Sequence, residues 1–436
     1  MTDQIQIGLI GIAIAFFLII IRTPIGVALA LVSFGGIYAL TSFKAAWSIL
    51  TIVPYNFITD WNLSAIPTFL LMGYIASQAG LTGGLFAAMR VFFGRVPGGL
   101  ASSTVIASAL FASASGSSVA TAAAFSRIAV PEMLKARYQP GLACGSVAAA
   151  GTLGSLIPPS ILLILFGIFT DASISALFIA GVIPGILSAA MYIAMITLRS
   201  WADPDLAPVS NETYSWNEKW RTLLDIWPLP TLIIAVLGGI SAGFFTPTEA
   251  GAVGAFLAII IAVVRKQMTW GIFVRATIDT AVGTATIFII AIGASMLSSF
   301  MALSGLPAFL SSVLLEYTNG PLSLILIIGV AFLILGMFIE SISLILLTLP
   351  VVLPMLLALD VNLIWFGIIM VKLLEIGLIS PPLGMNVFVM KSSLGDQIPL
   401  AVMFKGAMWF ILVDLMTLGL LISFPAISLW LPGIVQ

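Results

Sequence analysis

Apolar runs separated by short polar breaks cover almost the whole chain. A membrane-crossing helix needs about 20 consecutive apolar residues. Eight runs approach that length without an internal break and are predicted to be crossings: 5–21, 26–40, 64–79, 174–198, 227–244, 250–264, 279–303 and 402–429. Segment 48–62 contains Pro54, Asp60 and Trp61, so we expect an interfacial segment there instead. The pattern predicts an all-α polytopic membrane protein.

Two further apolar runs are interrupted in the middle. Run 143–170 contains GTLGSLIPPS, and run 361–390 contains GLISPPLGMN. Adjacent prolines remove two backbone donors, so a continuous helix cannot pass through them. Unpaired backbone groups are costly in hydrocarbon, and such a break persists only where protein or a polar cavity surrounds it. We expect two broken helices, which mark the binding site in many secondary transporters.

Two other segments are predicted to be re-entrant helical hairpins. Segment 101–130 consists mostly of small residues, with basic residues on both sides. Because positive residues prefer the cytoplasmic side, this segment is expected to enter and return, with its tip near 114–118. Small residues allow the two arms to pack closely. Segment 322–359 is interrupted by polar residues and prolines, and we expect its tip near 340–343.

The second half of the chain repeats the plan of the first. Three pairs of landmarks hold an offset of 223 or 224 residues: Pro24 with Pro247, Ser117 with Ser341, and Pro158 with Pro381. We therefore predict a first repeat at 1–200, a polar cytoplasmic linker at 201–226 and a second repeat at 227–436. Each repeat has five predicted crossings, one of them broken, and one hairpin. Five is odd, so the repeats are expected to have inverted topology.

The distribution of basic residues predicts the orientation. With the N-terminus outside, the cytoplasmic side receives nearly all of them: Arg22, Arg90, Arg95, Arg127, Lys135, Arg137, Arg199, Lys219, Arg221, Arg265, Lys266, Arg275 and Lys391. Lys405 lies close to that side, and Lys44 falls outside. The positive-inside rule thus predicts that both termini are external.

Composition narrows the function classes. The chain is 61% hydrophobic and 8% charged, with a mean hydropathy of +1.22, which excludes a soluble domain. There is no His and a single Cys144, which excludes His-dependent metal sites, His general bases and a disulfide framework. We therefore expect neither an enzyme nor a nucleic-acid-binding protein. No G-x-x-x-x-G-K-[ST] motif occurs, so transport energy is expected to come from an ion gradient or another subunit.

The tips and breaks are predicted to meet near the membrane midplane. Half-helix N-termini suit a substrate carboxylate, and unwound carbonyls and hydroxyls suit Na⁺, the expected co-transported ion. The predicted Na⁺ ligands are Gly116, Ser117, Ser118, Thr121, Gly154, Ser155, Leu156, Glu340, Ser341, Ser343, Ile379, Ser380 and Gly384. The predicted substrate-binding residues are Ser117, Pro158, Pro159, Ser160, Ser341, Pro381, Pro382 and Asn386. The alternative for each Ser and Gly is simple close packing of membrane helices.

Charged residues inside the apolar runs need partners or a function. Glu340 either neutralises a cation or caps the adjoining half-helix. Lys372 and Glu375 lie three residues apart and are interpreted as a mutual ion pair. Asp279 and Glu249 are interpreted as helix caps. Asp414 has no partner that the sequence makes evident.

Four segments resemble the large membrane subunit of tripartite ATP-independent periplasmic (TRAP) transporters. They are GGISAGFFTPTEAGAVGA at 238–255, ASGSSVATAAAFSRIAVPEM at 114–133, GSLIPPS at 154–160 and GLISPPLGMNVFV at 377–389. The resemblance covers essentially the whole chain, and no departure from the family occurs in these motifs.

The resemblance implies a bacterial inner-membrane protein that works with a small four-helix membrane subunit and a periplasmic substrate-binding protein. It implies uptake of small organic acids, such as C4-dicarboxylates, sialic acid or sugar acids, with Na⁺. It also implies an elevator mechanism, with hairpins and broken helices in the moving domain. The family's ion sites would fall on 116–121 with 154–160, and on 340–343 with 380–386.

Other classes remain open at this point. A stand-alone Na⁺/carboxylate symporter of similar inverted architecture would need no binding protein. A channel fits less well, because two hairpins suit alternating access better than a continuous pore. A purely structural scaffold predicts that Ser117 and Ser341 tolerate bulky replacements without loss of uptake.

Overall fold

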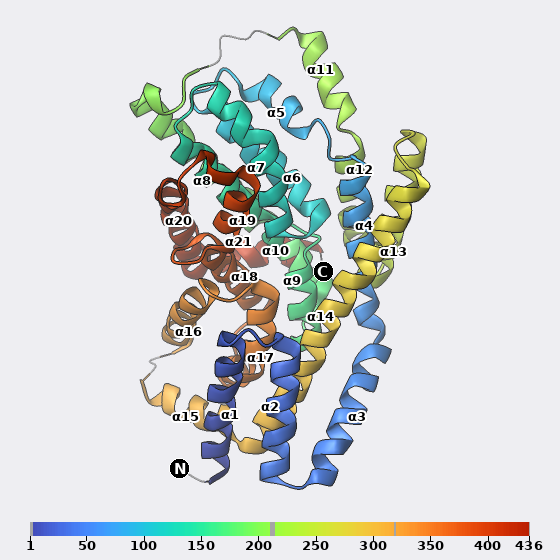
Figure 1. Cartoon of the computed structure of the whole chain (residues 1–436), viewed down its shortest axis with the longest axis vertical. Helices are drawn as coiled ribbons and strands as arrows, with labels where there is room; N and C mark the ends of the chain where they lie inside the picture. Colours follow the sequence, from blue (N-terminus) through green and yellow to red (C-terminus); the bar gives the residue numbers. More distant parts are fainter. Residues whose placement is uncertain (1–2, 210–213, 318–319, 436) are drawn as a thin grey trace.

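The computed structural model describes residues 3–209, 214–317 and 320–435, and every element in these ranges is a helix, as predicted (Figure 1). Residues 210–213 of the predicted linker and 318–319 of the second half lie outside the described residues. Seven described spans are long and apolar enough to cross a membrane, or eight if one bent pair is counted. The predicted total of ten crossings therefore stays a prediction.

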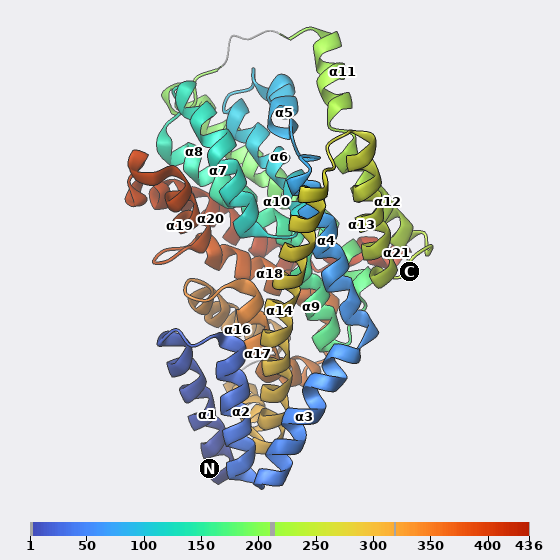
Figure 2. The ribbon, with the colours of Figure 1, turned by 45° about the vertical axis from the view of Figure 1, so that its right-hand side comes forward.

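The N-terminal helices gather at one end of the molecule (Figure 2). They are α1 (Asp3–Ile20), α2 (Ile25–Leu40) and α3 (Phe43–Thr59). Most of segment 48–62 lies in α3, which continues through Pro54 and ends at Thr59. This helix is not one of the described helices long and apolar enough to cross a membrane, and its interfacial position stays a prediction. The Ser42 side chain caps this helix by accepting from the amide of Ala45.

The first hairpin consists of α6 (Gly99–Ser115) and α7 (Ser118–Lys135). Gly116 ends α6 with φ of +62°, a left-handed conformation that glycine adopts without strain. Ser117 is extended, and its side chain caps α7 by accepting from the amide of Ala120. The turn lies within the tip that the sequence indicated.

The first broken helix consists of α8 (Pro140–Leu156) and α9 (Ile161–Thr170). Pro158 and Pro159 lie in the break, where their missing donors cost no helical hydrogen bond. Ser160 caps α9 by accepting from the amide of Leu163. The two prolines thus end the first half-helix, and the Ser160 cap starts the second.

The second half contains helices of matching length and order. Its hairpin is α16 (Pro321–Gly336) with α17 (Ser341–Ala358), and its broken helix is α18 (Leu363–Ile379) with α19 (Met385–Leu394). Helices α8 and α18 have 17 residues each, and α9 and α19 have 10 each. The turn of the second hairpin covers residues 337–340, so it overlaps the tip predicted at 340–343 only at Glu340.

The remaining helices surround these four pairs. They are α4 (Ala65–Gln78), α5 (Leu85–Phe93), α10 (Ile174–Ala202), α11 (Trp216–Asp225), α12 (Pro228–Ser241), α13 (Pro247–Val264), α14 (Trp270–Ser304), α15 (Leu306–Tyr317), α20 (Leu400–Ser423) and α21 (Ala426–Val435). Helix α14 has 35 residues and runs obliquely along much of the molecule (Figure 1).

The two predicted caps have different outcomes. Glu249 belongs to a capping box with Thr246 at the start of α13, which confirms the interpretation. Asp279 is not a cap, because α14 begins earlier, at Trp270, and Thr269 caps it. Asp279 instead accepts a hydrogen bond of 2.6 Å from the side-chain amide of Gln78, which joins α14 to α4.

Candidate functional site

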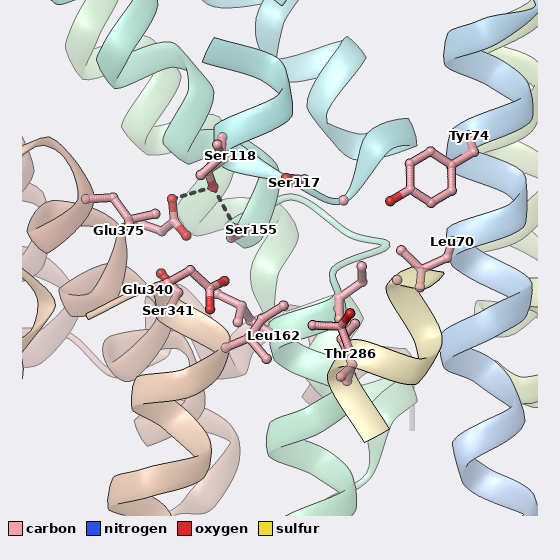
Figure 3. Close-up of a pocket in the computed structure, with 17 residues that line it drawn as sticks. Leu70, Tyr74, Ser117, Ser118, Ser155, Leu162, Thr286, Glu340, Ser341 and Glu375 are labelled. Atoms are coloured by element: carbon pink, nitrogen blue, oxygen red, sulfur yellow. Dashed lines mark hydrogen bonds between the residues drawn. The ribbon is translucent and has the colours of Figure 1, made fainter. Parts of the chain in front are cut away.

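A cavity of about 250 Å³ lies between the two hairpin tips. The tips contribute Gly116 and Ser117 from one side and Glu340 and Ser341 from the other (Figure 3). Helices α8, α9 and α18 contribute further walls. The opposite wall belongs to α4 and α14, with Leu70, Tyr74, Gly283, Thr286 and Ile287.

Three helix N-termini line this cavity. Ser118 begins α7, Ile161 begins α9 and Ser341 begins α17, and all three residues line the wall. The first turn of a helix presents unpaired amides and a positive dipole end. The polar breaks therefore create a site suited to an anionic group.

Ser118 connects three chain segments at the edge of the cavity. Its hydroxyl donates to the Oε2 atom of Glu375 at 2.6 Å and lies 2.8 Å from the hydroxyl of Ser155 (Figure 3). All three side chains are buried, and Glu375 is only 2% exposed. The first hairpin tip, α8 and α18 are thus joined by one hydrogen-bonded cluster.

The ion pair predicted between Lys372 and Glu375 is wrong. The ammonium of Lys372 pairs with the Oδ1 atom of Asp414 in α20 and donates to the hydroxyl of Ser188 in α10 at 3.0 Å. The phenol of Tyr192 donates to the same oxygen of Asp414. This network gives Asp414 the partner that the sequence did not reveal. The signal available in the sequence was a basic residue and an acidic residue in two apolar segments, Lys372 and Asp414, because buried charges need partners.

Glu340 is the N-cap of α17, which confirms the capping alternative. Its Oε2 atom accepts from the backbone amide and the hydroxyl of Ser343, both at 3.2 Å. Glu340 also lines the cavity, as Glu375 does. No Lys or Arg occurs among the described residues of the wall, so the cavity has two carboxyl groups and no basic side chain.

Six of the predicted site residues line the cavity: Gly116, Ser117, Ser118, Ser155, Glu340 and Ser341. Others lie just behind it. Thr121 donates to the carbonyl of Ser117, Ser160 donates to the carbonyl of Ser155, and Ser343 contacts Glu340.

The remaining predicted residues do not reach the wall of this cavity: Gly154, Leu156, Pro158, Pro159, Ile379, Ser380, Pro381, Pro382, Gly384 and Asn386. Ser380 donates to the carbonyl of Ile376, and Asn386 donates to the carbonyl of Ala148 in α8. Their predicted ligand roles stay predictions. Sequence reasoning missed Tyr74 and Thr286, which lie on unbroken helices without a motif, and it gave Glu375 no place in the site.

Comparison with known proteins assigns the chain to a family. Residues 12–427 match the family described as the tripartite ATP-independent periplasmic transporter, DctM component. The chain belongs to this family. It is therefore a multi-pass permease of the bacterial inner membrane, and the resemblance seen in the sequence is confirmed.

Relatives align over most of their length. The sialic acid TRAP transporter large permease SiaM of Vibrio cholerae is 32% identical, over 86% of this chain and 87% of SiaM. The C4-dicarboxylate TRAP transporter large permease DctM of Pseudomonas aeruginosa is 35% identical, over 86% of each chain. The DctM protein of Vibrio cholerae is 31% identical over 98% of each chain.

A solved structure has a similar fold. The YdaH transporter of Alcanivorax borkumensis gives a TM-score of 0.64 over 89% of this chain and 90% of that chain. Sequence identity is 17%, so the likeness concerns the fold.

Proposed function

We propose that this chain is the translocating subunit of a secondary transporter that imports a small organic acid together with Na⁺. A periplasmic binding protein delivers the substrate, and a small membrane subunit completes the transporter. The names of the relatives support the substrate class, because sialic acid, C4-dicarboxylates and 2,3-diketo-L-gulonate are all organic acids. The observation that carries the proposal is the convergence of three helix N-termini on one cavity.

The substrate carboxylate binds between the tips. Amides at the starts of α7 and α17 face it, together with the hydroxyls of Ser117 and Ser341. A cavity of about 250 Å³ is close to the lower end of the range for small-molecule sites. The site thus suits a compact acid.

Na⁺ binds to hydroxyl and carbonyl oxygens near the tips. Hydroxyls cluster there at Ser118, Ser155 and Ser341, and unwound backbone adds carbonyls. The Na⁺ ions orient the tips and partly neutralise the negative charge of the two carboxyl groups in the wall, those of Glu340 and Glu375. Uptake therefore depends on an inward Na⁺ gradient.

Alternating access follows from the division of the cavity wall. The hairpins and broken helices form one side, while α4 and α14 form the other (Figure 3). Movement of the first group past the second exposes the cavity to each face of the membrane in turn. This is an elevator arrangement with inverted repeats.

Reconstituted uptake tests the proposal. The chain and its small membrane subunit are placed in proteoliposomes, and labelled organic acids are added with or without the binding protein and an inward Na⁺ gradient. The expected result is uptake that needs both. Uptake with Na⁺ but without the binding protein supports a stand-alone symporter, and uptake without any Na⁺ dependence contradicts Na⁺ coupling.

A further inference from the structure

Glu375 is a buried carboxyl group with an incomplete set of partners. It is 2% exposed, and its Oε2 atom accepts from Ser118. Its Oε1 atom is fully buried and has no hydrogen-bond partner among the described residues. An ionised carboxylate removed from water needs a cation or several donors, because burial without them costs far more than one hydrogen bond returns.

Among the described residues, no Lys or Arg forms an ion pair with this carboxylate. Lys372 lies one helical turn earlier, but its ammonium is directed to Asp414 and Ser188. A second carboxyl group, that of Glu340, lines the same cavity. The described wall contains no basic residue that would offset either group.

Neutral oxygens share the cluster and the cavity wall with Glu375. Ser118 and Ser155 lie in the same hydrogen-bonded cluster as Glu375. The hydroxyl of Ser341 is also buried without a partner in the described structure, and this residue lines the same cavity. A carboxylate and several hydroxyls form an oxygen donor set of the kind that hard cations prefer.

We propose that Glu375 is the anionic ligand of a monovalent-cation site, formed with Ser118 and Ser155 where α18 meets the first hairpin tip and α8. The site takes Na⁺ rather than Ca²⁺ or Mg²⁺. The described residues contain no group of three or more acidic, His or Cys side chains that a divalent ion would favour. This inference rests on the proposed Na⁺ coupling, and it adds Glu375 to the Na⁺ ligands that the sequence predicted.

The proposed site determines the order in which cation and substrate bind during transport. Before the cation binds, the cavity has two carboxyl groups facing an incoming organic acid, and like charges repel. The cation removes part of that repulsion and joins three segments, Ser118 of the tip, Ser155 of α8 and Glu375 of α18. Cation binding therefore precedes substrate binding.

The test measures Na⁺ binding directly and needs no substrate. The full chain is placed in lipid nanodiscs, and radioactive Na⁺ is titrated with choline as the inert replacement. Glu375→Gln keeps the size and a hydrogen-bond acceptor but removes the charge. The matched control is Glu340→Gln, which removes the other carboxylate of the same cavity, the one already used as a helix cap. Size-exclusion chromatography and thermal unfolding check that each variant folds.

The expected result is a loss of Na⁺ affinity of at least about tenfold in Glu375→Gln, as removal of a charged ligand predicts. Glu340→Gln changes the affinity by less. If Glu375→Gln does not fold, Glu375→Asp and Ser118→Ala replace it, and each is expected to weaken binding.

Two results overturn the inference. One is unchanged Na⁺ binding in Glu375→Gln, or in both replacement variants. The other is an infrared carbonyl band of a protonated carboxylic acid that persists at saturating Na⁺ and disappears in Glu375→Gln. Absence of Na⁺ binding to the unmodified chain contradicts the proposed Na⁺ coupling itself, which separates the two failures.

Discussion

The buried ion pair between Lys372 and Asp414 gives the sharpest prediction for stability. The two side chains are 3% and 1% exposed. Asp414→Asn preserves the shape of the side chain but leaves the ammonium of Lys372 without a counter-charge. The ammonium is then left with uncharged groups, the Asn oxygen, the hydroxyl of Ser188 and the ring of Tyr192, and none of them replaces a carboxylate.

The expected cost follows from burial. Removal of one partner of a buried ion pair typically destabilises a protein by about 3–5 kcal/mol. We expect a loss in that range for the free energy of unfolding. The double variant Lys372→Met with Asp414→Leu removes both charges and fills the space with apolar groups, so it is expected to be more stable than Asp414→Asn.

Unfolding of the purified chain in mixed micelles compares the stability of the unmodified chain, Asp414→Asn and the double variant. The control is Asp396→Asn, which breaks an ion pair between Lys391 and a fully exposed Asp396 and is expected to have no measurable effect. The reasoning is refuted if Asp414→Asn is as stable as the unmodified chain, or if the double variant is less stable than Asp414→Asn.

Three further predictions concern packing, capping and the cavity. Gly406→Ala places a Cβ atom 1.8 Å from the carbonyl oxygen of Gly141, so we expect destabilisation of at least about 2 kcal/mol by the same unfolding assay. Gly419→Ala, in the same helix but with no atom near the new Cβ, is the control, and equal effects contradict the close packing. Thr246→Ala removes the capping side chain of α13 and is expected to cost about 1 kcal/mol, whereas unchanged stability would show that the cap contributes nothing. Ser341→Leu fills the wall of the cavity and is expected to abolish uptake in proteoliposomes without unfolding the chain, and normal uptake would mean that the substrate passes elsewhere.

The breaks in the chain were predictable because their causes are local. Adjacent prolines end α8 and α18 whatever surrounds them, and Gly116 with Ser117 forms a turn and a cap from its own atoms. A single proline is a weaker local signal than an adjacent pair, because Pro54 lies inside α3 and the helix continues to Thr59.

Partners across the fold were not predictable from spacing. Lys372 and Glu375 are close in sequence, yet Asp414, 42 residues away, accepts from the ammonium instead. The choice depends on how α18 packs against α20, which no local motif records. For the same reason the sequence did not predict that Tyr74 lines the cavity. Nor did it predict that Asn386 donates a hydrogen bond to α8, away from the cavity.

The central claim is that the cavity between the hairpin tips holds the transported substrate. The most direct measurement uses Ser117→Cys in a chain where the single native cysteine is replaced by Cys144→Ala, with thiol labelling followed over time. The account predicts that Na⁺ together with the organic acid identified by uptake slows labelling at this position. Ser312→Cys, outside the cavity, is expected to react at the same rate throughout. A labelling rate at position 117 that neither Na⁺ nor substrate changes would contradict the account.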